Sequence, residues 1–390
     1  MYTSEKTFRK SYKPIFNSIE ALNFYDTNLY LFDNIEVEQW QRNVINKKAL
    51  YIYNNFPLVH SCIEKIIDFT IQNGIRYIQN DIDYFNNKYK NELLKNKIEN
   101  EINLFFEKIS YCEDSYLLLR NILRRILLFG RCILHKVKDS QEFKIEILND
   151  FQVCNIDKKN TLIYNFKNKN ITLRESEYLI INNSPNLSIL YPVIESCEKI
   201  KEYIEIELTN ANVSSLFSVF ITREQATDAL FNVQNRDILH PNGLYPGAIF
   251  ELNDGERIES VNPTRPNPNF SEYVKQNGIF ITSCLGVPYE IATQNFQNSY
   301  SASRAAFSVF KTTCIKYQNL LDRFYFWALL ETKLKMIFEN NSVYKKFMSG
   351  HFVFPIIESI SPIEDLEVLE KKRELKISNE KADAIAVNGE

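Results

Sequence analysis

The sequence has 390 residues, of which 45% are hydrophobic and 24% charged, so it is long enough for two or three domains and too apolar for wholesale disorder. The formal net charge of −3 argues against tight duplex binding through a basic face, although not against a protein that only surrounds DNA. The seven cysteines are scattered and form no CxxC pair, which favours buried reduced thiols over a zinc site. No apolar signal core or membrane-length apolar run occurs, so we expect assembly in the cytoplasm and no membrane partner.

The first half of the chain alternates helical and strand-like patterns. Apolar residues recur at helical spacing over 59–70, and Gly74 is the expected C-terminal cap before a strand over 75–78. A charged helix over 84–108 and a strongly apolar helix over 115–129, ended by Gly130, come next. Strand-like segments follow at 132–137 and within 143–182. This pattern predicts an α+β domain.

The second half opens with a two-faced helix over 191–211. One face carries the apolar stripe Val193, Cys197, Ile200, Ile204, Leu208 and Ala211. The other carries Glu195, Glu198, Glu202 and Glu205. Residues 213–268 are rich in proline and glycine and predict a small β-rich module with long loops. A helix over 270–284 follows, with Gly278 inside it, and then a polar loop.

A long helix over 303–339 is the last strong element. Its apolar residues repeat at strict spacings of three and four: Phe307, Phe310, Cys314, Tyr317, Leu321, Phe324 and Ala328. Such a repeat requires another helix on that face, and the simplest interpretation is a packed core.

Motifs of catalysis and metal binding do not occur in the sequence. It contains no GxxxxGK[ST], GxGxxG, HExxH or GxSxG pattern. His60 and Glu64 lie one helical turn apart without an evident third ligand, and Asp254 and Glu256 flank a turn-forming Gly255. His135 lies in a strand-like run, where a core or edge role is the simpler interpretation. We therefore expect no enzymatic activity, no metal and no cofactor.

Residues 244–307 carry a series of motifs whose order and spacing are more specific than any one piece. They are Pro246-Gly247, Gly255-Glu256, Asn262-Pro263, Arg265-Pro266-Asn267, Leu285-Gly286-Val287-Pro288-Tyr289-Glu290, Tyr300-Ser301 and Arg304-Ala305. This series resembles the portal proteins of lambdoid phages. Weaker similarity extends over about residues 45–375. Asn295 and Ala302 depart from the family pattern, as do the segment before the first stem helix and the short C-terminal part.

The resemblance implies a portal-like α+β subunit with a wing, a two-helix stem, a β-containing clip and a long C-terminal helix. Its parts would be the wing at 1–188, the first stem helix at 189–212, the clip at 213–268, the second stem helix at 269–286, the tunnel loop at 287–303, the long wing or crown-side helix at 304–345, and the C-terminal segment and tail at 346–390. The implied function is a structural ring, with dodecamers usual, through which double-stranded DNA is packaged and ejected.

The resemblance also implies partners and a location. The partners would be further copies of the chain, double-stranded DNA, the large terminase, the major capsid protein or scaffold, and head-tail connector proteins. The location would be the portal vertex of the virion, after assembly in the cytoplasm of a bacterial host. Another phage head or connector structural protein is the alternative function, and a packaging-associated enzyme is a further one.

Site residues follow from the same resemblance. The loop residues Gln294, Asn295, Gln297, Asn298 and Tyr300 are expected near DNA, unless Phe296 and Tyr300 only anchor the loop on the wing. The glutamate stripe either lines the channel and repels phosphate or forms a solvated outer face, partly neutralised by Lys199 and Lys201. The stiff clip residues Pro263, Arg265, Pro266 and Asn267 are expected to dock a partner. Gly286, Pro288, Tyr289, Glu290 and Arg304 form a structural motif, in which Arg304 would pair with Glu290.

Overall fold

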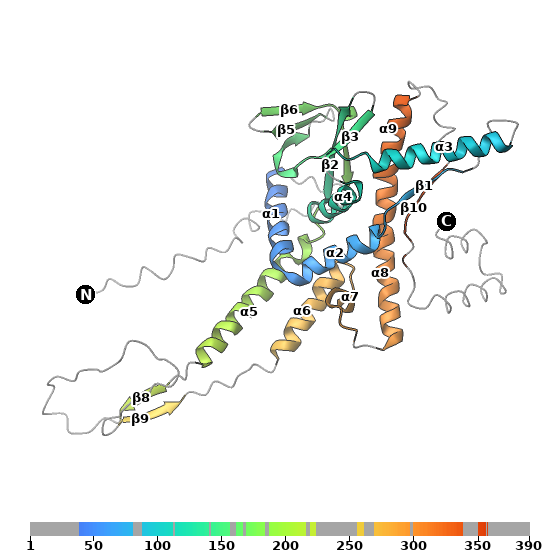
Figure 1. Ribbon diagram of the computed structural model, residues 1–390. Coiled ribbons are helices and arrows are strands. Elements are labelled where there is room, and N and C mark those ends of the chain that lie inside the picture. Colours follow the sequence, from blue (N-terminus) through green and yellow to red (C-terminus); the bar gives the residue numbers. More distant parts are fainter. Residues whose placement is uncertain are drawn as a thin grey trace, which may run out of the picture.

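Helices form the frame of the described structure (Figure 1). The computed structural model describes residues 39–80, 88–111, 114–139, 142–156, 161–166, 169–183, 187–215, 219–223, 256–260, 269–296, 299–337, 350–355 and 357. The α-helices are α1 (Gln39–Asn55), α2 (Pro57–Ile71), α3 (Lys88–Glu107), α4 (Ser115–Phe129), α5 (Ile194–Ser215), α6 (Phe270–Cys284), α7 (Tyr289–Thr293), α8 (Tyr300–Leu321) and α9 (Trp327–Ile337).

Small antiparallel sheets complete the fold. The strands are β1 (Arg76–Ile78), β2 (Arg131–Asp139), β3 (Glu142–Ile147), β4 (Val153–Ile156), β5 (Leu162–Phe166), β6 (Lys169–Leu173), β7 (Tyr178–Asn182), β8 (Val219–Arg223), β9 (Glu256–Ser260) and β10 (His351–Val353). β2 lies between β3 and β7, and β5 lies between β4 and β6. β1 pairs with β10, and β8 pairs with β9. The prediction of an α+β fold is confirmed.

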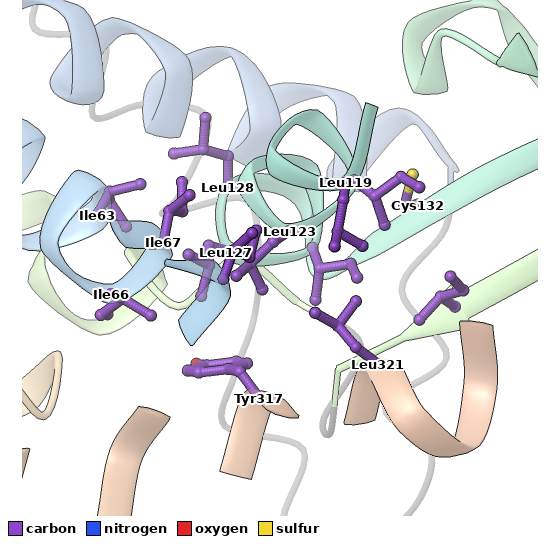
Figure 2. Packing of buried hydrophobic residues seen from close by; sticks show 14 of the residues in the cluster. Ile63, Ile66, Ile67, Leu119, Leu123, Leu127, Leu128, Cys132, Tyr317 and Leu321 are labelled. Atoms are coloured by element: carbon purple, nitrogen blue, oxygen red, sulfur yellow. The ribbon is translucent and has the colours of Figure 1, made fainter. Parts of the chain in front are cut away.

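The hydrophobic core is built around α2, α4 and α8 (Figure 2). Ile63 and Ile67 of α2, Leu123 and Leu127 of α4, and Leu321 of α8 are all fully buried. The spacing of four residues within α2 and within α4 places each pair on one face of its helix. Burying a side chain of this size contributes about 1.5–3 kcal/mol relative to leaving it exposed. The apolar periodicity read from the sequence therefore marks the true core.

Helix ends agree with the sequence in one case and differ in another. α4 ends at Gly130, which has a left-handed φ of 75°, as predicted. α2 ends earlier than predicted, because Gln72 and not Gly74 is its C-cap, with a φ of 42°. The N–H of Gln72 donates to the Asp68 carbonyl oxygen at 2.9 Å, so the helix closes before Gly74 is reached.

The long C-terminal helix contains a π-helical turn that the three–four repeat did not predict. Residues Asp322–Phe326 form this turn between α8 and α9, and Phe324 is consequently 43% exposed instead of buried. Buried residues instead follow a spacing of four: Tyr317, Leu321, Tyr325 and Leu329. Each step of four advances about 40° beyond a full α-helical turn, so a wider turn is needed to keep these side chains on the core face.

Most of the described cysteines are buried and reduced. The buried free thiols are those of Cys62, Cys132, Cys197 and Cys314. Burial raises the pKa of each of these thiols to about 12, which makes them unreactive. Cys154 and Cys284 are exposed, and Cys112 lies outside the described residues. The expectation of buried thiols is therefore met by four of the six described cysteines.

A polar network joins α1, α2 and α4 beside the core. The Arg124 guanidinium donates to both Glu64 carboxylate oxygens, at 2.8 and 2.9 Å, and the Tyr53 hydroxyl donates to one of them at 2.6 Å. Arg120 bridges Glu64 and Asp68. Burial alone would raise the pKa of Glu64, but these hydrogen bonds and the two arginine charges lower it to about 2. Glu64 therefore joins α1, α2 and α4 through its hydrogen bonds and ion pairs.

We predict that Glu64→Gln lowers the stability of the fold at neutral pH by about 1.5–3 kcal/mol, because the arginine hydrogen bonds lose their charged acceptor. Folding lowers the pKa of Glu64 from its ordinary value of 4.5 to about 2. The contribution of the Glu64 carboxylate to the stability of the fold is therefore complete above pH 4.5 and is lost as the pH falls toward 2. Denaturant unfolding of both proteins across this range measures the difference. Glu92→Gln on the exposed part of α3 is the matched control. A stability difference that stays constant from neutral pH down to pH 2 would contradict this account.

Candidate functional site

The first candidate stem helix, α5, is buried only along its first half. Val193, just before the helix, and Cys197 and Ile200 within it are at most 4% exposed and pack into the core. Further along the same apolar stripe, Ile204 and Leu208 are 38% and 62% exposed. The helix therefore leaves the core while its apolar stripe continues, and Figure 1 shows its far end leading toward β8.

The second candidate stem helix, α6, runs beside α5 (Figure 1). Its bounds, Phe270–Cys284, are those predicted from the sequence. The ring of Tyr203 on α5 stacks on Phe270, with centroids 5.8 Å apart, and meets Tyr273 at 4.6 Å. These aromatic contacts join the two helices beyond the core, which the sequence pattern did not reveal.

Gly278 allows a close helix contact inside α6. A Cβ atom at this position would lie 2.9 Å from the Tyr289 ring of α7 and 3.4 Å from Leu58 of α2. The residue is buried, so its lack of a side chain serves packing. The glycine inside the predicted helix is thus what lets α6 approach α7 and α2 closely.

The glutamate stripe of α5 has mixed surroundings. Glu198 pairs with Lys48 of α1 at 3.6 Å and is 26% exposed. Glu195 pairs with Lys199 at 2.6 Å, and Glu205 lies 3.9 Å from Lys201, with all four of these side chains exposed by 41% or more. Glu202 is exposed as well. The two lysines thus partly neutralise the stripe, and a channel-facing orientation stays a prediction.

The segment after α6 holds a tight turn against α8. Gly286 has a left-handed φ of 71°, and its carbonyl oxygen accepts a hydrogen bond from Thr313 Oγ1 at 3.0 Å. A Cβ atom at position 286 would lie only 2.8 Å from that hydroxyl oxygen. Both the backbone conformation and the available space therefore require glycine. This contact fixes the end of α6 on α8.

Part of the segment 287–303, the predicted tunnel loop, is helical. Pro288 precedes the short helix α7, which begins with Tyr289 and Glu290. The Ser61 hydroxyl of α2 donates to the Ala292 carbonyl oxygen at 2.6 Å and holds this helix in place. Proline before an acidic first turn is a helix-start signal that identifies α7 in retrospect. The sequence-based assignment missed it because five residues are too few for periodicity.

The described loop between α7 and α8 is exposed. Gln294 adopts a left-handed φ of 57°, and Gln294, Asn295 and Phe296 are all exposed. Tyr300, the first residue of α8, is 54% exposed, and Phe296 is 61% exposed, so neither ring is buried in its own subunit. Gln297 and Asn298 lie outside the described residues. Contact of this loop with DNA stays a prediction.

Other predicted site residues are not tested by the described geometry. Pro263, Arg265, Pro266 and Asn267 lie outside the described residues. Earlier in the segment 213–268, β8 and β9 pair with each other over five residues each. Pairing of Arg304 with Glu290 also stays a prediction. Over the described residues, no group of three or more His, Cys, Asp or Glu is placed to hold a metal ion. Among the described helices, none has the length and hydrophobicity needed to cross a membrane.

Comparison with known proteins supports the same assignment. The sequence at residues 186–318 matches the family described as phage portal protein, lambda family. These residues include α5, α6, α7 and nearly all of α8. No curated protein matches the sequence.

Solved structures resemble the whole fold. The chain is similar to a protein in the neck of a native gene transfer agent particle computed with C12 symmetry, with a TM-score of 0.57, 9% identity, and coverage of 87% of this chain and 93% of that one. It is also similar to a protein in the virion of a native gene transfer agent particle, with a TM-score of 0.55, 11% identity, and coverage of 88% and 93%. At such low identities these likenesses establish the fold alone.

The class of protein that residues 186–318 match is that of phage portal proteins, and the fold is similar to that of proteins in gene transfer agent particles. The particular resemblance read from the sequence motifs, to portal proteins of the lambda family, is confirmed by the family match at residues 186–318.

We predict that Gly286→Ala destabilises the fold by more than about 1–2 kcal/mol, because a left-handed alanine is strained and its Cβ also meets Thr313. Gly74→Ala is the matched control, since Gly74 has a φ of 98° but open space around its Cβ position. The difference between the two losses, measured by denaturant unfolding, isolates the Thr313 contact. Thr313→Ala in the Gly286→Ala background should recover part of the loss. Equal losses in both glycine variants would contradict the steric role of Thr313.

Proposed function

We propose that this chain is a subunit of a portal ring of twelve copies, through which double-stranded DNA is packaged into a capsid and later ejected. The proposed location is the portal vertex of a virion, after assembly in the cytoplasm of a bacterial host. The proposed partners are the large terminase, the major capsid protein or scaffold, and head-tail connector proteins. The C12 symmetry of the similar neck protein supports the ring and its copy number.

The observation that carries this proposal is the helix pair α5 and α6. The two helices start from the core side by side, are joined by the Tyr203 contacts, and extend away from the core together (Figure 1). The apolar residues Ile204 and Leu208 on this projection are exposed to solvent, and neighbouring subunits in an assembly could cover them. In a ring of identical copies, the helix pair of each copy would lie beside the central axis.

The exposed loop between α7 and α8 is the proposed DNA-facing element. Its residues Gln294 and Asn295 are uncharged hydrogen-bonding groups, which can touch a phosphate backbone without strong electrostatic capture. The proposal extends to Gln297, Asn298 and Tyr300 on the same segment. Pro263, Arg265, Pro266 and Asn267 are proposed to dock a partner at the far end of the helix pair.

We predict that the purified protein forms rings with a central hole, visible by electron microscopy, and has a mass of many copies in solution. The protein should hydrolyse neither ATP nor DNA in the same preparation. Monomers or closed two-fold dimers at every concentration would contradict the ring. Hydrolysis that follows the protein through purification would favour a packaging enzyme instead.

We also predict that Gln294→Glu combined with Asn295→Glu leaves ring formation intact but lowers the amount of DNA packaged severalfold, because two added negative charges per copy repel phosphate. The measurement compares ring yield with packaged DNA in an assembly assay. Thr172→Glu, on the exposed hairpin strand β6, is the matched control. Normal packaging by the double variant would show that this loop does not face the DNA.

A further inference from the structure

Charge is distributed unevenly between the helices of the site. α5 carries five glutamates against two lysines, a net charge of −3. α8 carries Arg304, Lys311 and Lys316 and no acidic residue, a net charge of +3. α6 carries one glutamate and one lysine and is neutral. The net charges of α5 and α8 are thus equal in size and opposite in sign.

The two charged helices are separated by α6 and α7, and we call α5 the acidic flank and α8 the basic flank. Figure 1 shows α5 on one side of α6 and α7, and α8 on the other side. Within one copy, α6 and α7 therefore stand between the acidic and the basic helix. Opposite charge on opposite flanks is what a head-to-tail contact between identical copies requires.

Exposed side chains make these charges available to a partner. Glu202 is exposed, and Glu205 is 56% exposed with only a long contact of 3.9 Å to Lys201. On α8, Lys316 is exposed and Lys311 is partly exposed. Lys316 lies 5.6 Å above the ring of its neighbour Tyr317, within the same helix.

We propose that α5 of one copy packs against α8 of the next copy around the ring, with the acidic flank of the first meeting the basic flank of the second. This inference rests on the proposed ring function. It identifies α5 and α8 as the surfaces through which neighbouring copies join to close the ring. Exposed ion pairs contribute little affinity each, so the charges mainly set the orientation of the subunits and the rate of their association.

Exposed apolar residues on the same helices supply the burial that such a contact needs. Leu208 and Ile204 on α5 are 62% and 38% exposed, and Val309 and Ile315 on α8 are 63% and 38% exposed. Removing these side chains from water favours association, and the charges elsewhere on the same helices favour one register over others.

The test uses two charge-reversed forms of the full chain. The acidic-flank variant carries Glu202→Lys and Glu205→Lys, and the basic-flank variant carries Lys311→Glu and Lys316→Glu. Either form alone brings like charges together at every contact, so each should require about tenfold more protein to form rings. Glu92→Lys with Lys97→Glu on α3 is the matched control, and thermal unfolding checks that every form folds.

The decisive arm of the test mixes the two variants. In a mixed ring with alternating subunits, the reversed α5 of one variant meets the reversed α8 of the other, while the unchanged helices meet at the next contact. Mixing two assembly-deficient proteins should therefore restore rings, and so should combining all four substitutions in one chain. The defect of each single form should also shrink at high salt, where the screening length falls from about 10 Å at 0.1 M to about 3 Å at 1 M.

Each other outcome overturns the inference. Normal rings from both separate variants would show that other surfaces close the ring. Normal rings of the acidic-flank variant that retain DNA more tightly would place these glutamates in the channel instead. Absence of rings from the unmodified protein would contradict the proposed function itself, and with it this inference.

Discussion

The burial of α5 at one end only is the constraint on which the rest of the structure depends. Its first half lies in the core through Cys197 and Ile200, while Ile204 and Leu208 beyond them are solvent-exposed. A helix held at one end needs support along its length, and α6 supplies it through the Tyr203 contacts. The helix pair is therefore anchored in the core at one end, and Figure 1 shows the paired strands β8 and β9 beyond its other end.

The anchor works because α2 touches almost every element of the site. Its apolar face packs against α4 and α8, and its polar face carries Glu64, held by arginines from α4. The hydroxyl of Ser61 on the same helix holds α7. Gly286 and Thr313 then join the end of α6 to α8. These contacts join α7 to α2 and the end of α6 to α8.

Much of this arrangement could be predicted from the sequence, because strong periodicity marks long helices. The bounds of α4 and α6 and the buried face of α2 follow from apolar spacing and from glycine or proline near the helix ends. The resemblance to portal proteins came from short motifs whose residues have tight steric roles, such as Gly286.

Other features depend on contacts between distant segments, which a linear pattern does not contain. The π-helical turn exposes Phe324 and buries Tyr325, and the three–four repeat was equally consistent with an uninterrupted helix. α7 is too short for periodicity and is held by Ser61, more than 200 residues earlier in the chain. The position of Glu198 beside Lys48 likewise follows from how α5 lies against α1.

Cryo-electron microscopy of the purified assembly is the most direct measurement of the central claim, that a one-end-anchored helix pair surrounds an open axis. The account predicts that α5 and α6 of every copy stay paired and stand around a central hole, with the 213–268 segments gathered at one narrow end. Density in which residues 213–268 fold back into a closed globule, with the two helices apart and pointing in unrelated directions, would contradict it.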